Sequence, residues 1–457
     1  MISTLRTYQR LVRADRSGQH SGEQRAIARN GLRQIVADTL QAIGDQVVNA
    51  KTVLPWLLAS LGAPAVLIGL LVPIRESGSM LPQAAMTGPL QRLRRRRMAW
   101  VAGAAGQAAG AAAMAFAAAV LEGAAAGWAI LGALAVFALS RALCSLAGKD
   151  VMGRTVPKGE RGQITGLSTV FSGAVAITLG LLIRVLGGEE VSPLVLASLL
   201  GGAALAWVGA GAVFAGIREP DPEPDPEPDE GPDREPIDRA GQSPGGDGTA
   251  ADDDGDAGWA RRSWTLLRGD GVFRRFVLAR TLLLVSALSP PFVVALAAGV
   301  AGAGLSGLGP FVIAQGVASL VGGKPFGTLA DRSSRSLMMW GAGASVAVLA
   351  AFLGALAVPG ARQLWWLYPV VYLLLVTAHT AVRVARKTYV VDVAEGDRRT
   401  EYVAVANTAI GVLLLVVGGL SGALAALGPE VALGFLALMG LAGVLVSRSL
   451  PEVSKPA

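Results

Sequence analysis

Apolar stretches of about twenty residues alternate with short polar segments along most of the chain. This length matches an α-helix that crosses the hydrocarbon core of a bilayer. The pattern predicts an all-α membrane protein with twelve transmembrane helices in two six-helix halves. The predicted spans are 33–60, 64–86, 98–121, 125–148, 163–186 and 191–217, then 273–299, 305–328, 336–358, 364–386, 402–427 and 429–449. The first span is weak because it carries several polar residues.

The two halves are joined by a segment that cannot form a packed core. Residues 219–256 hold fifteen carboxylates and two arginines, and proline takes alternate positions at their start. Alternating proline prevents a helix, and the crowded negative charges keep the chain extended. We therefore predict an acidic, disordered linker that is dispensable for folding.

These patterns divide the chain into five parts. They are a basic N-terminal tail (1–32), a six-helix half (33–217), the linker (218–262), a second six-helix half (263–450) and a short C-terminal tail (451–457). A helix on the membrane surface around residues 5–12 is the alternative interpretation of the first tail.

The two halves repeat one another, which indicates a duplicated bundle with pseudo-symmetry. Glu76, Gly88, Arg141 and Lys149 precede Gln315, Gly327, His379 and Lys387 by 238 or 239 residues. The weak first span is supported in the same way, since RQIVADTL at 33–40 resembles RFVLARTL at 275–282.

Charge sets the orientation of the bundle. The net charge is +7 although the linker is strongly acidic, so the excess of Lys and Arg lies between the apolar segments. Basic loops at 92–97, 149–162, 331–335 and 383–399 alternate with loops that hold almost no Lys or Arg. The positive-inside rule then places these loops, the linker and both termini in the cytoplasm, in a multi-pass protein of the cell (inner) membrane. This distribution does not favour nucleic-acid binding.

The first span carries a stripe of polar side chains on one helical face. Its members are Gln34, Asp38, Gln41, Asp45, Asn49 and Thr52, at intervals of three or four residues. Such a face must meet a water-filled cavity or polar partners rather than lipid. Lys51 lies off this face and is expected to point outward. In the alternative interpretation, residues 33–45 form an amphipathic helix on the cytoplasmic surface, which leaves only about fourteen residues to enter the membrane.

A second group of ionisable residues lies near the middle of the second span. Counting from the span ends places Arg75 and Glu76 at the depth of Asp45, where they would form one network with an excess of negative charge. One carboxylate would then be able to bind a proton, and Asp45 is favoured because it belongs to the polar stripe. A structural ion pair that fastens two helices is the alternative. The predicted central cavity contains Asp38, Gln41, Asp45, Asn49, Arg75, Glu76 and Gln315.

Four further basic residues are expected to act as gates or helix anchors. Arg141 and His379 hold equivalent positions in the fourth and tenth spans, Arg280 is equivalent to Asp38, and Arg383 follows His379 by one turn. For His379 alone, a packing role is the alternative.

The segment GTLADRSSR at 327–335 resembles the loop signature of the major facilitator superfamily. The first half keeps Gly88 and Leu90 of that signature but has Arg92 where the family has aspartate, and Arg141 matches the arginine of the family's fourth helix. The fifth span lacks the Gly-Pro pair of the family's drug/proton antiporters. The resemblance implies a transporter that works by alternating access, with a central site between its halves. The loop-motif residues are Gly88, Gly327, Asp331, Arg332 and Arg335.

We therefore predict a carrier of a small-molecule substrate, coupled to protons or acting as a facilitator without a coupling ion. A non-transporting sensor or assembly partner is the alternative from another class, and a cavity filled by side chains would favour it. The chain has one cysteine and two distant histidines, so no metal, cofactor or enzyme activity is expected. The expected partners are the solute, the lipid bilayer and protons, with no nucleic acid, and the protein is expected to act as a monomer.

Overall fold

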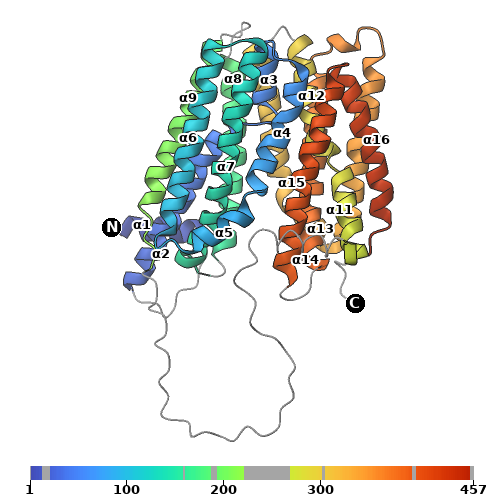
Figure 1. The fold of residues 1–457 in the computed structure, drawn as a ribbon. Helices are drawn as coiled ribbons and strands as arrows, with labels where there is room; N and C mark the ends of the chain where they lie inside the picture. Colours follow the sequence, from blue (N-terminus) through green and yellow to red (C-terminus); the bar gives the residue numbers. More distant parts are fainter. Residues whose placement is uncertain are drawn as a thin grey trace, which may run out of the picture.

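The structure is a computed structural model that describes residues 2–12, 21–157, 160–186, 193–220, 268–300, 304–393 and 398–452. Helices make up nearly all of these residues, and no strand occurs in this part of the chain. The helices stand side by side in two groups, with the first half and the second half next to one another (Figure 1).

The first half begins with a broken span. Its helices are α2 (Ser21–Val47), α3 (Val53–Ser60), α4 (Ala65–Met80), α5 (Gln83–Gln91), α6 (Arg96–Val120), α7 (Gly123–Thr155), α8 (Arg161–Leu186) and α9 (Pro193–Ala215). Between α2 and α3, the side-chain oxygen of Asn49 accepts a hydrogen bond of 2.9 Å from the backbone nitrogen of Lys51. A short polar side chain that bonds to its own backbone competes with the helix, and this accounts for the break at residues 48–52.

The second half repeats this arrangement, and its first span is also broken. It contains α11 (Gly271–Leu282), α12 (Val285–Val300), α13 (Gly309–Leu356), α14 (Leu367–Val393), α15 (Arg398–Ala425) and α16 (Pro429–Arg448), with short 3₁₀ turns η1 (Leu305–Gly307) and η2 (Ala361–Gln363). The helix α13 covers two spans, because the chain turns at Ser333, where φ and ψ are not helical. The predicted all-α fold of twelve spans in two six-helix halves is confirmed.

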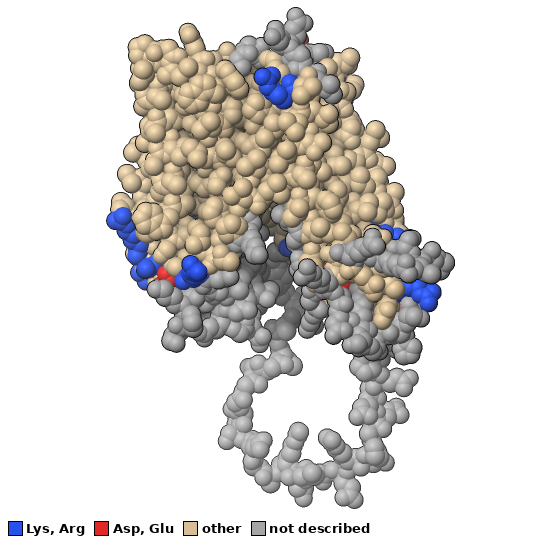
Figure 2. Space-filling view, turned by 180° about the vertical axis from the view of Figure 1, so that it is seen from behind, with Lys and Arg blue, Asp and Glu red and all other residues tan. Residues whose placement is uncertain are grey.

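The surface has the character of a membrane protein. Among the described residues, eight helices are long and apolar enough to cross a membrane by themselves. Figure 2 shows a broad uncharged band, with most of the visible charged side chains gathered at one end. We call this the basic end, and the first described helix, α1, lies toward it as well (Figure 1). The protein is therefore a multi-pass integral membrane protein.

Two helix pairs hold the halves together at the opposite end of the bundle, where glycines allow close approach. A methyl group at Gly69 of α4 would lie 2.5 Å from the Cα of Gly422 in α15. One at Gly309 of α13 would lie 2.6 Å from the carbonyl oxygen of Gly180 in α8. Small residues at such crossings let helix backbones pack directly in lipid. These four glycines, here called the glycine seal, join the halves on the side away from the basic end.

The N-terminal segment contains a helix where the alternative interpretation of the first tail places one. Residues 2–11 form a helix, α1 (Ile2–Leu11), and α2 already begins at Ser21. Tyr8 is fully buried against Gly31 of α2, and its hydroxyl donates a hydrogen bond of 2.7 Å to Glu160. The segment is therefore packed onto the first half, because the missing side chain at Gly31 makes room for the tyrosine ring.

The ends of the two halves are tied down in the same way. The carboxylate of Glu219 accepts hydrogen bonds from the backbone nitrogens of Arg96 and Arg97, at 3.2 and 2.7 Å. In the second half, Arg335 donates to the carbonyl of Leu450 at 3.1 Å and lies 3.6 Å from the carboxylate of Glu452. The predicted linker thus begins with a structured residue, Glu219, whereas residues 221–262 of it lie outside the described part of the chain.

Deleting residues 221–262 and joining the ends with a glycine-serine chain of similar length should leave the fold intact. Their composition, rich in proline and carboxylates, cannot support a core. The deleted protein should melt in detergent within about 1 °C of the full chain. Replacing Glu219 with alanine as well should lower the melting temperature, since two backbone donors lose their acceptor.

The same segment tests the topology. Limited proteolysis of inside-out vesicles should cut within 221–262 and leave two associated halves. Protection of this segment in inside-out vesicles, with cleavage in right-side-out cells, would reverse the predicted orientation.

Candidate functional site

A polar cavity of about 740 Å³ lies between the two halves. This is the size of pockets that hold small molecules. The first half contributes side chains from α2, α4, α7 and α8, and the second half contributes side chains from α13 and α14. Its charged lining residues are Asp38, Asp45, Lys51, Arg75, Glu76, Arg141, Lys149 and Arg383. The polar stripe of the first span therefore lines a cavity, as predicted for the interpretation in which residues 33–45 belong to the bundle.

The cavity reaches toward the basic end and is closed on the other side. Its lining extends to Lys149 near the end of α7, and Figure 2 shows a notch between the halves at this end. On the other side, aromatic rings of Trp56, Phe311 and Tyr372 pack together, with centroids 6.1 and 5.4 Å apart along the row. The Tyr372 hydroxyl donates to the side-chain oxygen of Gln315 at 3.0 Å, which fixes the inner surface of this closed side.

Asp45 forms the centre of an ion-pair network in the first half. One carboxylate oxygen lies 2.9 Å from Arg75, and the other lies 2.9 Å from Arg141. Arg75 also donates to the carbonyl of Val48 at 3.2 Å. The amide oxygen of Gln41, in the orientation that the hydrogen-bond pattern requires, accepts from Arg141 at 3.0 Å. Three spans that are distant in sequence are thus joined at one carboxylate.

This network corrects the predicted charge balance. We expected Asp45, Arg75 and Glu76 to form a group with excess negative charge, with Arg141 kept apart as an anchor. Instead, Arg141 enters the cavity and gives Asp45 a second guanidinium partner. The carboxylate of Glu76 interacts electrostatically with several cations, among them Lys51, Arg75 and Arg386. The network therefore has excess positive charge. The prediction was wrong because the sequence does not reveal that the fourth span turns Arg141 toward α2.

Asp38 has a different environment from Asp45. Its two carboxylate oxygens accept hydrogen bonds from neutral donors, the Gln34 amide and the Ser168 hydroxyl, both at 3.3 Å. Arg141 interacts electrostatically with the Asp38 carboxylate but does not form a direct ion pair with it. Unlike Asp45, Asp38 can therefore gain or lose a proton without breaking an ion pair.

Lys51 points into the cavity, contrary to the prediction that it faces outward. Its ammonium nitrogen lies 3.0 Å from Nε2 of His379, and Nδ1 of His379 lies 3.1 Å from the Ser286 hydroxyl. The prediction failed because helical spacing was extended past the break at residues 48–52, where the chain direction changes. This contact links the two halves across the cavity. His379 also lines the cavity.

The remaining predicted residues fall into two places. Asn49, Gln315 and Arg383 line the cavity. Arg280 is only 6% exposed, does not line the cavity, and donates to the side-chain oxygen of Asn407 at 3.2 Å. Arg386 was missed by the sequence analysis, although its spacing from His379 and Arg383 on α14 was a usable signal.

The loop motif lies at the basic end, away from the cavity. Gly327 and Arg332 are in α13 near its turn at Ser333, Gly88 is in α5, and Arg335 holds the chain that follows α16. The side chain of Asp331 lies outside the described part of the structure.

A duplicated bundle of twelve membrane-spanning segments around a polar cavity defines a membrane carrier of small solutes. The chain belongs to the Major Facilitator Superfamily, a family of secondary transporters, whose family model matches residues 42–382.

Solved structures give the same fold. The D-xylose–proton symporter matches with a TM-score of 0.66 and 12% identity, covering 93% of this chain and 98% of that chain. The inward-open xylose transporter from E. coli matches with a TM-score of 0.61 and 12% identity, covering 92% and 96%. The nucleoside transporter NupG matches with a TM-score of 0.65 and 10% identity, covering 92% and 99%. At these identities the likeness establishes the fold, and no curated protein matches the sequence.

Proposed function

We propose that the protein carries a small polar solute across the cell membrane by alternating access, with the basic end and both termini in the cytoplasm. The observation that carries this proposal is the cavity of about 740 Å³, lined by charged residues of both halves and closed at one end. A sensor that has lost transport would be expected to fill this space with side chains. The cavity therefore favours transport over the sensor interpretation.

Transport can be tested without knowing the solute. Proteoliposomes that contain the purified protein would be incubated with a ¹³C-labelled metabolite extract, and the labelled compounds inside would be identified by mass spectrometry. At least one polar metabolite should enter these vesicles and not protein-free vesicles. The Asp45→Asn protein serves as the inactive control, because it lacks the carboxylate that joins three spans. Entry of no compound would favour the sensor.

We further infer that Asp38, rather than Asp45, binds a coupling proton. Protonating Asp45 would leave two guanidinium groups without their carboxylate, whereas Asp38 accepts only from neutral donors. The Asp38→Asn protein should lose accumulation driven by an imposed pH gradient, while exchange of labelled for unlabelled solute continues. The measurement is flux into proteoliposomes with and without the gradient.

Two outcomes contradict this inference. An Asp38→Asn protein that still concentrates solute on the gradient would exclude Asp38 as the proton site. A wild-type protein that ignores the gradient would identify a facilitator. Ser168→Ala is the matched control, since it removes one hydrogen bond to Asp38 but keeps the carboxylate.

A further inference from the structure

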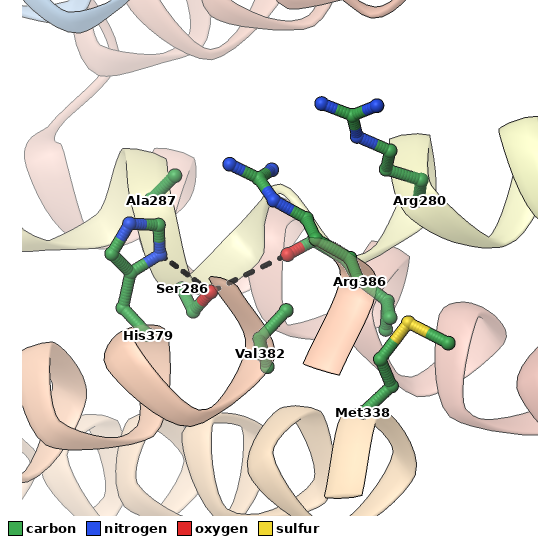
Figure 3. A pocket seen from close by; sticks show the side chains of 8 residues that line it. Arg280, Ser286, Ala287, Met338, His379, Val382 and Arg386 are labelled. Atoms are coloured by element: carbon green, nitrogen blue, oxygen red, sulfur yellow. Dashed lines mark hydrogen bonds between the residues drawn. The ribbon is translucent and has the colours of Figure 1, made fainter. Parts of the chain in front are cut away.

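A cluster of basic side chains lies where the second half meets the cavity. His379, Arg383 and Arg386 recur on one face of α14, and Arg280 approaches from α11. Arg280, His379 and Arg386 line the same small pocket, next to the main cavity that His379 also lines. In Figure 3, the imidazole and both guanidinium groups extend in the same direction. We call Arg280, Arg383 and Arg386 the arginine cluster.

The arginine cluster lacks the counter-ions that the first half has. Among the described residues, no carboxylate lies within 4.0 Å of any of these three guanidinium groups. Arg280 donates a hydrogen bond to the neutral side chain of Asn407, and the Nε atoms of Arg280 and Arg386 are buried without an acceptor. Buried cations without partners are unfavourable by several kcal/mol, so this region favours an anion.

The main cavity adds to this imbalance. Its lining contains five cationic side chains and three carboxylates, and Asp45 is already shared by Arg75 and Arg141. Glu76 interacts electrostatically with both Lys51 and Arg386, so this single carboxylate is shared by cations from both halves. Lys51 itself reaches across to His379 at 3.0 Å. Positive charge is therefore concentrated between Lys51 in the first half and α14 in the second.

We propose that the solute is a small anion whose carboxylate or phosphate group binds between Lys51, Arg383 and Arg386. This proposal rests on the proposed transport function and names the chemical class of its solute. Guanidinium groups bind carboxylate and phosphate oxygens in pairs of charge-assisted hydrogen bonds. An anion in this position contacts both halves at once, so its binding stabilises the arrangement in which they approach one another.

Binding is tested on the purified full-length protein in detergent. Melting temperatures would be measured with phosphate and with citrate, against chloride at the same ionic strength. At least one of the two oxyanions should raise the melting temperature of the wild-type protein by about 3 °C or more, in a saturable way. The Arg383→Gln/Arg386→Gln protein should lose this response. Arg448→Gln is the control, because this arginine is exposed in the last turn of α16.

The stability without oxyanion provides a second measurement on the same proteins. Because Arg386 carries a buried Nε without an acceptor, the double variant should melt in chloride at the same temperature as the wild type or higher. No oxyanion response in the wild type would overturn the proposal, and so would a response that the double variant keeps in full.

Flux measurements separate this proposal from the proposed function. If an oxyanion stabilises the protein through the two arginines but no labelled metabolite enters proteoliposomes, transport fails and the anion site stands. If a neutral metabolite enters and phosphate and citrate neither stabilise the protein nor compete with it, transport stands and the anion site is refuted. Entry of anionic metabolites that the double variant no longer carries supports both.

Discussion

Replacing Asp45 with asparagine should abolish measurable transport and lower the free energy of unfolding by about 2 kcal/mol. The value lies between those of exposed and buried ion pairs, because the Asp45, Arg75 and Arg141 side chains are 19–27% exposed to the cavity. The loss has two parts. Two guanidinium groups lose their carboxylate, and α4 and α7 lose their common partner on α2.

A double variant distinguishes loss of charge balance from loss of shape. Asp45→Asn/Arg141→Gln removes one positive charge together with the negative one, so it should recover part of the stability lost in Asp45→Asn. The control is Glu430→Gln, which breaks an ion pair of 2.9 Å with Arg362, whose side chain is 59% exposed. That control should change the melting temperature by less than about 1 °C. Equal melting temperatures of Asp45→Asn and the double variant would contradict an electrostatic role for the network.

The fold was predictable because its determinants are local in sequence. Apolar length gives the spans, and the alternation of basic and neutral loops gives their direction. The polar stripe was also predictable up to Asp45, since helical periodicity holds within α2. It failed at Lys51, because the backbone leaves the helix at residues 48–52 and the side chain then points to His379.

The partners within the cavity were not predictable, because they depend on how separate helices are rotated against one another. Arg75 was correctly placed at the depth of Asp45, and the structure joins them at 2.9 Å. Depth in the membrane alone, however, could not show that Arg141 faces the same carboxylate. It also could not show that Arg386 extends the basic face of α14 by one turn. Rotation about the helix axis is set by tertiary packing, for which a single sequence carries little signal.

The glycine seal shows the same limit. Gly69 and Gly309 are 240 residues apart, and Gly180 and Gly422 are 242 apart, so the two contacts are counterparts in the duplicated halves. The chain has 59 glycines, and nothing in the sequence separates these four from glycines that touch no other helix. The structure separates them, since a methyl group at each would meet backbone atoms of the neighbouring helix.

Replacing Gly309 and Gly422 with alanine should force the sealed end of the cavity open and reduce transport at least about tenfold. The added methyl groups would lie 2.6 Å from the carbonyl oxygen of Gly180 and 2.8 Å from that of Val66. Backbone atoms cannot turn aside as side chains do, so the helix pairs α8–α13 and α4–α15 must separate. Under alternating access, separation at this end is the opposite state of the carrier.

A cysteine reporter measures this change directly. Val312 is 1% exposed and lies one turn from Gln315, toward the sealed end. In a Cys144→Ala background, Val312→Cys should resist a membrane-impermeant maleimide added from outside the cell, and should react quickly once Gly309→Ala and Gly422→Ala are present. The matched controls are Gly354→Ala in α13 and Gly419→Ala in α15, where an added methyl group meets nothing within 4 Å. If the glycine-seal variant labels no faster than these controls while transport falls, the glycines stabilise the bundle but do not form the closed gate of the transport cycle.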